Sequence, residues 1–223
     1  IASCVTGFYS GDDKTFLQVS NTDLKNAKNY NIVNPNSINR DYQNISNLLD
    51  GINGTKHFIP IVKGGNVKYL KSEGWFMNWS KEAVKHYKTD KKARFQNPQF
   101  YFKFGIGVPM ISSSSITASL IEYKLFDQSI VGIFPKDESL TYYLLAFFNS
   151  PTCNKFIRTI NPSANNPANY IKKIPFIIPE KHVLNLINQK TSEILNSIKQ
   201  LGGYNDDTER EIWSIIEEIY QID

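Results

Sequence analysis

The spacing of apolar residues changes along the chain, from short runs in the first part to helical periodicity in the last part. Short apolar runs bounded by turn-forming residues predict strands at residues 16–19, 57–62, 74–79, 116–122 and 130–134. Between residues 21 and 54 the chain is rich in Asn, Asp and Ser, which predicts loops and at most one short helix. Strands followed by helices predict an α/β chain of the α+β type, with a mixed, mostly antiparallel sheet and packed helices.

Helical periodicity first becomes regular in the second half of the chain. Apolar residues recur three and four positions apart over residues 140–148 and again over residues 153–160, which predicts two amphipathic helices. A longer apolar stripe over residues 183–201 predicts a long helix that ends at Gly202-Gly203. We interpret these stripes as core surfaces.

A second helix is predicted from about Asp207, where Thr208 and Glu211 have the spacing of a capping box. With the preceding long helix it would form a hairpin. We therefore expect a sheet-containing domain over residues 1–180 and a C-terminal helical hairpin over residues 181–223. From residue 205 onward there are seven acidic residues and one basic residue, which favours docking of the hairpin on another protein element, or a spacer role, over contact with a polyanion.

One aromatic stretch, at residues 99–105, is expected to form a strand because aromatic residues alternate along it. In a strand, Phe102 and Phe104 would pack on one face, and Tyr101 and Lys103 would be presented on the other. The four serines that follow, at residues 112–115, suit a loop whose hydroxyl and amide groups contact phosphate.

Positive charge is concentrated in one segment. Residues 56–103 contain eleven basic and three acidic residues, a formal charge of +8, whereas the whole chain carries only +4. The rest of the chain is therefore net acidic. Concentrated basic charge is typical of a surface that binds a polyanion.

A glycine turn lies inside this basic segment. Gly64 and Gly65 follow a predicted strand, and a glycine pair lets the backbone turn sharply or approach a ligand closely. Lys63 and Lys68 flank the turn, and Ser80 is a plausible cap for a short basic helix after the next strand. The sequence therefore predicts a basic, aromatic surface around this turn.

Composition limits the class of protein. With 41% hydrophobic residues the chain can bury a substantial core, and no apolar run approaches the roughly 20 residues of a membrane-spanning helix. Cys4 and Cys153 lie far apart, which favours a reducing cytoplasm over a disulfide framework. Because the first residue is Ile1, we expect the chain to be a piece of a longer polypeptide.

Catalytic patterns are weak in this sequence. Glu122-Tyr123-Lys124 supplies an E-x-K triplet, but no Pro-Asp pair precedes it at the spacing of a nuclease metal site. Residues 97–100 (Asn-Pro-Gln-Phe) differ from the N-P-P-[YF] motif of amino-methylating enzymes at the third position. The three histidines do not cluster with Cys, Asp or Ser in the sequence. We interpret these patterns as chance similarities and expect no catalytic residues and no metal site in this chain.

The order of motifs resembles a known family. The motifs are the segment at residues 10–16 (Ser-Gly-Asp-Asp-Lys-Thr-Phe), the Lys-Gly-Gly turn at 63–65, the Trp-Phe-Met-Asn-Trp segment at 75–79, the Leu-Leu-Ala-Phe-Phe-Asn-Ser segment at 144–150 and the Ile-Pro-Phe-Ile-Ile-Pro segment at 174–179. In this order they resemble the C-terminal target recognition domain of type IIG restriction–modification enzymes and of related phage-resistance adenine methyltransferases, which are relatives of type I specificity subunits. The segment at 174–179 resembles the closing strand of that family.

The resemblance implies sequence-specific recognition of duplex DNA. It also implies that upstream domains of the same polypeptide hold the chemistry: an adenine-N6 methyltransferase that uses S-adenosylmethionine, with or without a Mg²⁺-dependent endonuclease. This fragment itself would need no cofactor.

The residues expected to contact DNA supply basic, hydroxyl, amide, aromatic and glycine backbone groups. They are Ser10, Lys63, Gly64, Gly65, Asn66, Lys68, Tyr69, Asn78, Trp79, Lys91, Lys92, Arg94, Lys103, Ser112, Ser113, Ser114 and Ser115. Two other interpretations stay open from the sequence. One is a single-stranded nucleic-acid binder that stacks bases on Trp75, Trp79 or Tyr101. The other is a protein-interaction module that works through its helical hairpin.

Overall fold

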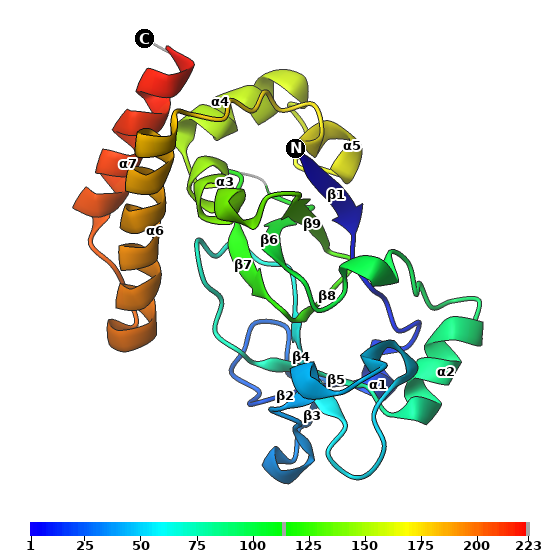
Figure 1. Cartoon of the computed structure of the whole chain (residues 1–223). Coiled ribbons are helices and arrows are strands. Elements are labelled where there is room, and N and C mark those ends of the chain that lie inside the picture. Colours follow the sequence, from blue (N-terminus) through cyan, green and yellow to red (C-terminus); the bar gives the residue numbers. More distant parts are fainter. Residues whose placement is uncertain (113–114, 222–223) are drawn as a thin grey trace.

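The computed structural model describes residues 1–112 and 115–221, and it has the predicted α+β architecture (Figure 1). Within these residues the strands form a four-stranded sheet in the order β1-β9-β6-β7 and a five-stranded sheet in the order β3-β2-β5-β4-β8. Most strand pairs are antiparallel, and β2–β3 and β4–β8 are parallel. The prediction of a mixed, mostly antiparallel arrangement is confirmed.

The four-stranded sheet supports the C-terminal helices. Its strands are β1 (Ala2–Thr6), β9 (Ile130–Pro135), β6 (Phe104–Pro109) and β7 (Ser119–Glu122). β9 pairs with β1 on one side and with β6 on the other, and all its residues are buried because its side chains alternate between two hydrophobic clusters, with Val131 and Ile133 in one and Ile130 and Phe134 in the other. The apolar helix α3 (Thr141–Phe148) packs against β6. A strand covered in this way reads as a continuous apolar run, and the run at residues 130–134 predicted β9. The sequence did not predict β1.

The five-stranded sheet carries the basic segment. Its strands are β3 (Asn31–Ile32), β2 (Leu17–Val19), β5 (Trp75–Asn78), β4 (Phe58–Val62) and β8 (Leu125–Phe126). The helices α1 (Asp13–Phe16) and α2 (Lys81–Thr89) lie at this end of the molecule (Figure 1). Short 3-10 turns occupy much of the predicted loop region: η1 (Pro35–Ser37), η2 (Tyr42–Asn44) and η3 (Leu48–Asp50).

The C-terminal helices share a hydrophobic core with the four-stranded sheet. They are α4 (Pro151–Ile160), α5 (Ala168–Ile171), α6 (Lys181–Leu201) and α7 (Asp206–Tyr220), and η5 (Glu138–Leu140) precedes α3. The antiparallel pair α6–α7 packs its apolar residues Ile187, Ile194 and Ile212 against α3 and the helices beside it. The apolar face of the hairpin is therefore covered by this chain. The domain boundary at residue 180 stays a prediction.

Several local signals are confirmed. The strands at β4, β5 and β9 lie where the apolar runs predicted them. The Ser80 side chain accepts a hydrogen bond from the backbone N–H of Ala83 at 3.2 Å and caps α2 as expected. Gly202 ends α6 with φ of 75°, a left-handed value that glycine adopts at little cost.

Other expectations are wrong. Residues 99–105 are not one strand, because η4 (Pro98–Phe100) precedes a left-handed Phe102 and β6 starts only at Phe104. As a result Tyr101 is buried. Residues 175–180 have no regular secondary structure, so the expected closing strand is absent from this described segment.

The boundaries of short elements also differ from the predictions. The strand expected from residue 16 begins at Leu17, because residues 13–16 form α1. The strand expected from residue 116 begins at Ser119. Asn205, and not Thr208, caps α7, and it accepts a hydrogen bond from the backbone N–H of Asp207 at 2.9 Å. Among the described residues, no helix is long and apolar enough to cross a membrane.

Shortening a buried leucine of α6 is expected to destabilise the chain much more than the same change at the end of the helix. Leu195 is 3% exposed and Leu201 is 82% exposed. Replacing Leu195 with Ala should lower the free energy of unfolding by about 3 kcal/mol, because the change leaves a cavity in the core. The matched control Leu201→Ala should cost less than about 0.5 kcal/mol in urea-induced unfolding. Equal losses would contradict the packing of α6.

Candidate nucleic-acid interface

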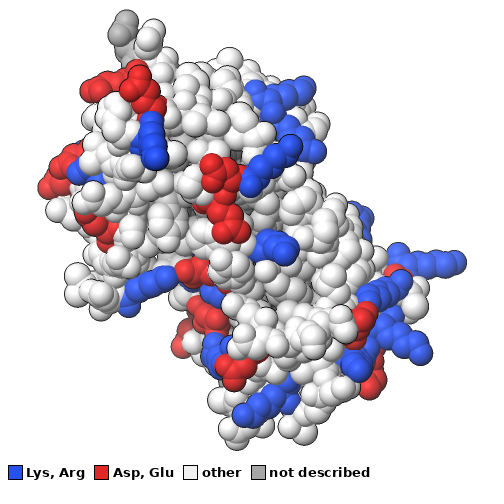
Figure 2. All heavy atoms as spheres, viewed as in Figure 1, with Lys and Arg blue, Asp and Glu red and all other residues white. Residues whose placement is uncertain are grey.

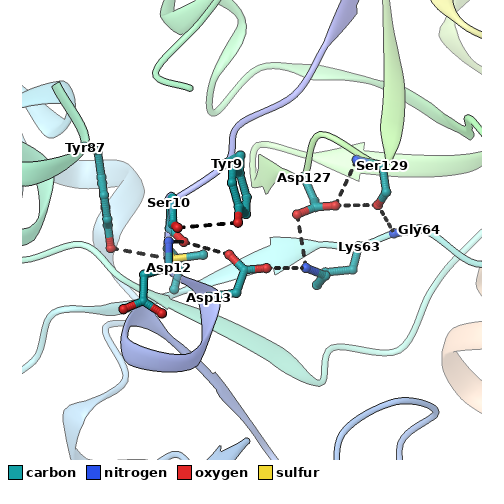
Figure 3. A network of polar contacts seen from close by, with 11 residues as sticks. Tyr9, Ser10, Asp12, Asp13, Lys63, Gly64, Tyr87, Asp127 and Ser129 are labelled. Atoms are coloured by element: carbon teal, nitrogen blue, oxygen red, sulfur yellow. Dashed lines mark hydrogen bonds and ion pairs between the residues drawn. The ribbon is translucent and has the colours of Figure 1, made fainter. Parts of the chain in front are cut away.

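Lys63 lies at the centre of a polar network that joins three distant segments of the chain (Figure 3). Its Nζ contacts Asp13 Oδ2 at 3.0 Å and Asp127 Oδ2 at 3.1 Å. Asp13 belongs to α1, Lys63 follows β4, and Asp127 follows β8. Ser10 is buried and donates to Asp13 Oδ1 at 2.7 Å. We call these residues, with Ser129, the Lys63 network.

Ser129 extends the network to the glycine turn. Its hydroxyl donates a short hydrogen bond to Asp127 Oδ1 and accepts from the backbone N–H of Gly64 at 3.0 Å. A Cβ at Gly64 would lie 2.8 Å from Ser129 Oγ, so this position requires glycine for close packing. Gly65 has φ of +122°, which side-chain-bearing residues rarely adopt. A side chain is therefore unfavourable at both positions, because of a close contact at Gly64 and because of the backbone angle at Gly65.

The charge of Lys63 is stabilised inside the protein. Burial alone would lower the pKa of Lys63, but the carboxylates of Asp127 and Asp13 outweigh it, so the pKa lies above its ordinary value. Asp127 has a side chain only 5% exposed, so it depends on this lysine for compensation of its charge. In this arrangement Lys63 already uses two of its three N–H donors on carboxylates.

Lys68 anchors the other end of the turn. Its Nζ contacts Glu209 Oε1 of α7 at 2.9 Å and lies 4.7 Å from the ring centre of Trp213. Glu209 is 4% exposed, and Tyr204 donates to it at 3.4 Å. Three ion pairs of Lys63 and Lys68 therefore hold the turn, and its tip at Gly65, Asn66 and Val67 is exposed.

The aromatic residues of the predicted surface mostly form core. Trp79 is fully buried, and its Nε1 donates to Leu48 O at 2.7 Å. Tyr69 and Tyr101 are buried as well, and burial raises the pKa of both hydroxyls. Trp75 is partly buried and lies edge-on to Tyr30. Stacking of bases on Trp79 or Tyr101 would require these rings to leave the core.

The polar candidates elsewhere have structural partners. Asn78 accepts from the backbone N–H of Ser80 at 3.0 Å, next to the start of α2. Ser112 is buried and donates a short hydrogen bond to Ser115 O, and Arg158 donates to Ser112 O at 2.8 Å. Ser115 is exposed, and Ser113 and Ser114 lie outside the described residues.

The exposed basic residues gather on and after α2. We define the α2 basic face by its exposed side chains: Lys81, Lys85, Lys88, Lys91, Lys92 and Arg94. Lys88 pairs with Asp50 at 2.8 Å. Figure 2 shows basic side chains at this end of the molecule and acidic ones along α7. Lys103 is also exposed, on the segment before β6.

The carboxylates around Lys63 and Lys68 were not found from the sequence. Asp13, Asp127 and Glu209 pair with lysines that are 50, 64 and 141 positions away. Neither periodicity nor a short motif reports such pairings. The described residues contain no group of three His, Cys, Asp or Glu side chains placed to hold a metal ion.

No protein-family model matches this chain, but it is similar to known proteins, among them the following two. The chain is 23% identical over 160 residues to the adenine-specific methyltransferase PglX of Lacticaseibacillus casei (strain Zhang), a match that covers 68% of this chain and 13% of that protein. The fold of this chain is also similar to part of the type IIL restriction–modification enzyme MmeI, whose structure was solved in complex with DNA. The match covers 100% of this chain and 33% of the MmeI chain, with a TM-score of 0.54 and 13% identity. The chain thus spans a small part of each protein.

Loss of the Lys63 ammonium group should destabilise the fold. Replacing Lys63 with Met would leave the buried Asp127 without its cation, and the free energy of unfolding should fall by about 3 kcal/mol. As a matched control, Lys88→Met removes a lysine whose partner Asp50 has a side chain 66% exposed, and it should cost less than about 1 kcal/mol. Similar losses in chemical denaturation would contradict the structural role of Lys63.

Lys71 should make stability depend on pH. Its Nζ donates to Lys63 O at 2.6 Å, and burial lowers the pKa of Lys71 from 10.5 to about 8. Between these two values the unfolded chain holds a proton that the folded chain has released, so the contribution of Lys71 to stability increases with pH. Relative to Lys71→Met, the native chain should gain roughly 2–3 kcal/mol of unfolding free energy from pH 7 to pH 10. The exposed control Lys85→Met should show no such change, and a constant difference for Lys71→Met would contradict the assignment.

Proposed function

We propose that this chain is the DNA target-recognition part of a restriction–modification enzyme, in which it binds duplex DNA and selects its sequence. The observation that carries the proposal is the similarity of fold, over the whole chain, to a restriction–modification enzyme solved with DNA. The sequence match to a protein named as an adenine-specific methyltransferase supports the same class. The α2 basic face supplies the charge that such a role needs.

Catalysis is assigned to other parts of the parent polypeptide. The described residues of this chain contain no cluster of metal ligands, and the Glu122 carboxylate of the E-x-K triplet is paired with Lys199 at 2.8 Å. We propose that the parent enzyme methylates adenine with S-adenosylmethionine, and that any Mg²⁺-dependent cleavage belongs to a separate domain. The C-terminal position of this chain in the parent, the upstream domains as partners, and a role in phage defence belong to the same proposal.

The structure changes which residues we assign to DNA binding. Lys85, Lys91, Lys92 and Arg94 are exposed, and we assign them to the neutralisation of phosphates. Lys63 and Lys68 are assigned to holding the glycine turn, because both are paired with buried carboxylates. The tip of the turn at Asn66 is free of such constraints and is exposed.

The burial of the residues that they would use argues against the two other interpretations. A single-strand binder would stack bases on Trp75, Trp79 or Tyr101, but Trp79 and Tyr101 are buried and Trp75 is partly buried. A hairpin that binds partner proteins through its apolar face would need that face uncovered, but Ile187, Ile194 and Ile212 lie in the core of this chain.

Charge reversal on the α2 basic face should weaken duplex binding. For the full 223-residue chain, neutralisation of about six phosphates predicts a slope near −5 for log affinity against log salt. Lys85→Glu combined with Lys92→Glu should lower affinity for a labelled duplex by about 10-fold or more in 0.1 M salt and make the slope shallower. The measurement is fluorescence anisotropy.

The matched control reverses the charge of two exposed lysines in the loop between β2 and β3. Lys25→Glu with Lys28→Glu makes the same change in net charge before β3 and should reduce affinity much less. Equal reductions would show that net charge alone governs binding. Salt-independent binding, or stronger binding to the separated strands than to the duplex, would overturn the proposed function.

A further inference from the structure

A groove of about 550 Å³ lies between three segments that are distant in the sequence. They are the η2–η3 region, residues 98–103 and the turn between β7 and β8. The residues that line the groove include three with amide side chains, one lysine and two aromatic residues: Gln43, Asn44, Gln99, Lys103, Phe102 and Tyr123. The described residues that line it include no Asp or Glu. We call it the amide groove.

Two aromatic residues of the amide groove have an unfavourable backbone conformation. Phe102 has φ of 59° and Tyr123 has φ of 54°, in the left-handed region that bulky side chains rarely adopt. Backbone strain of this kind persists only where the surrounding structure imposes it, and it gathers at functional sites. Such strain occurs on two sides of the amide groove. Together with the polar lining, this favours a ligand site in the groove.

The walls of the amide groove are fixed by the protein. Tyr42 donates through its hydroxyl to Tyr123 O at 3.0 Å, and the Tyr123 ring stacks on Phe104 with centroids 5.4 Å apart. Phe102 lies edge-on to the buried Trp79 at 5.6 Å. Walls that are already ordered do not lose further conformational freedom when a ligand binds.

Three of the amide and ammonium side chains of the groove are available, whereas Gln43 donates a hydrogen bond to the Tyr42 hydroxyl at 3.3 Å. The side chains of Asn44, Gln99 and Lys103 are exposed, and within the described part of the chain they make no hydrogen bond or ion pair. The floor is apolar: Leu48 and Tyr101 are buried, and the Tyr101 hydroxyl already donates to Gln96 O at 2.6 Å. A base drawn fully into the groove would find few polar partners, whereas a base edge at the rim would find several.

We propose that the amide groove reads base edges in the major groove of duplex DNA and favours an A·T pair. Asn and Gln amides form paired hydrogen bonds with N6 and N7 of adenine, and apolar surface accepts the C5 methyl group of thymine. Gln99 and Asn44 are the reading amides, and Lys103 contacts the neighbouring phosphate or a guanine edge. This inference rests on the proposed function, which supplies the DNA.

The test is selection from a pool of randomised duplexes by the full chain, followed by affinity measurements on the selected duplex and a scrambled one. The selected sequence should contain an A·T pair, and Gln99→Ala and Asn44→Ala should weaken the preference for that pair. Each change should lower the ratio of selected to scrambled affinity on the order of 10-fold, with little change for the scrambled duplex. The matched control Gln200→Ala, an exposed amide on α6, should leave the ratio unchanged.

Modified bases test the contact itself. Replacement of the adenine by 7-deazaadenine removes N7, and replacement of the thymine by uracil removes the methyl group. The native chain should lose affinity for both modified duplexes, and Gln99→Ala should be insensitive to the 7-deaza change. Thermal unfolding of each variant should match the native chain, because these side chains are exposed.

The outcomes distinguish failure of the amide-groove assignment from failure of the proposed function. If the native chain selects a sequence but both alanine variants keep the same preference, the assignment of the amide groove is wrong and the proposed function stands. If the native chain selects no sequence and binds no duplex, the proposed function fails and the amide groove has no DNA to read.

Discussion

The ion pairs of Lys63 with Asp13 and Asp127 are the interaction on which the rest of the arrangement depends. They join the side chains of the start of the chain, the end of β4 and the turn after β8. Backbone hydrogen bonds connect the same segments, from Phe8 N–H to Phe126 O at 2.8 Å and from Asp127 N–H to Val62 O at 2.9 Å. Because Asp127 is almost fully buried, its charge is tolerable only beside a cation. The same lysine begins the glycine turn, so the pairs that stabilise the fold also fix the base of an exposed loop.

Positive charge in this chain is divided between structure and surface. Lys63 and Lys68 are used internally, and the six residues of the α2 basic face are presented to solvent. A formal charge taken from the sequence counts both groups equally, although only the exposed group contributes strongly to long-range attraction of a polyanion. In the function we propose, the α2 basic face contacts phosphates, which positions DNA, and the amide groove contacts base edges, which discriminates between sequences.

Local signals in the sequence located elements where one physical rule dominates. Continuous apolar residues marked β4 and β9, and the Ser80 cap marked the start of α2. The strand predicted from the aromatic alternation at residues 99–105 is wrong, because Phe102 takes a left-handed conformation that tertiary packing imposes. The candidate site was only partly predictable: exposed lysines can be counted in a sequence, but the burial of Trp79 and the pairing of Lys68 with Glu209 depend on contacts between distant segments.

Hydrogen–deuterium exchange of the full chain, with and without duplex DNA, tests the central claim most directly. If the chain binds DNA through the α2 basic face and the amide groove, DNA should slow amide exchange at residues 42–50 and 81–103 and leave the exposed face of α6 and α7 unchanged. Slower exchange confined to α6 and α7, or no change at any position under conditions where the duplex is bound, would contradict the account.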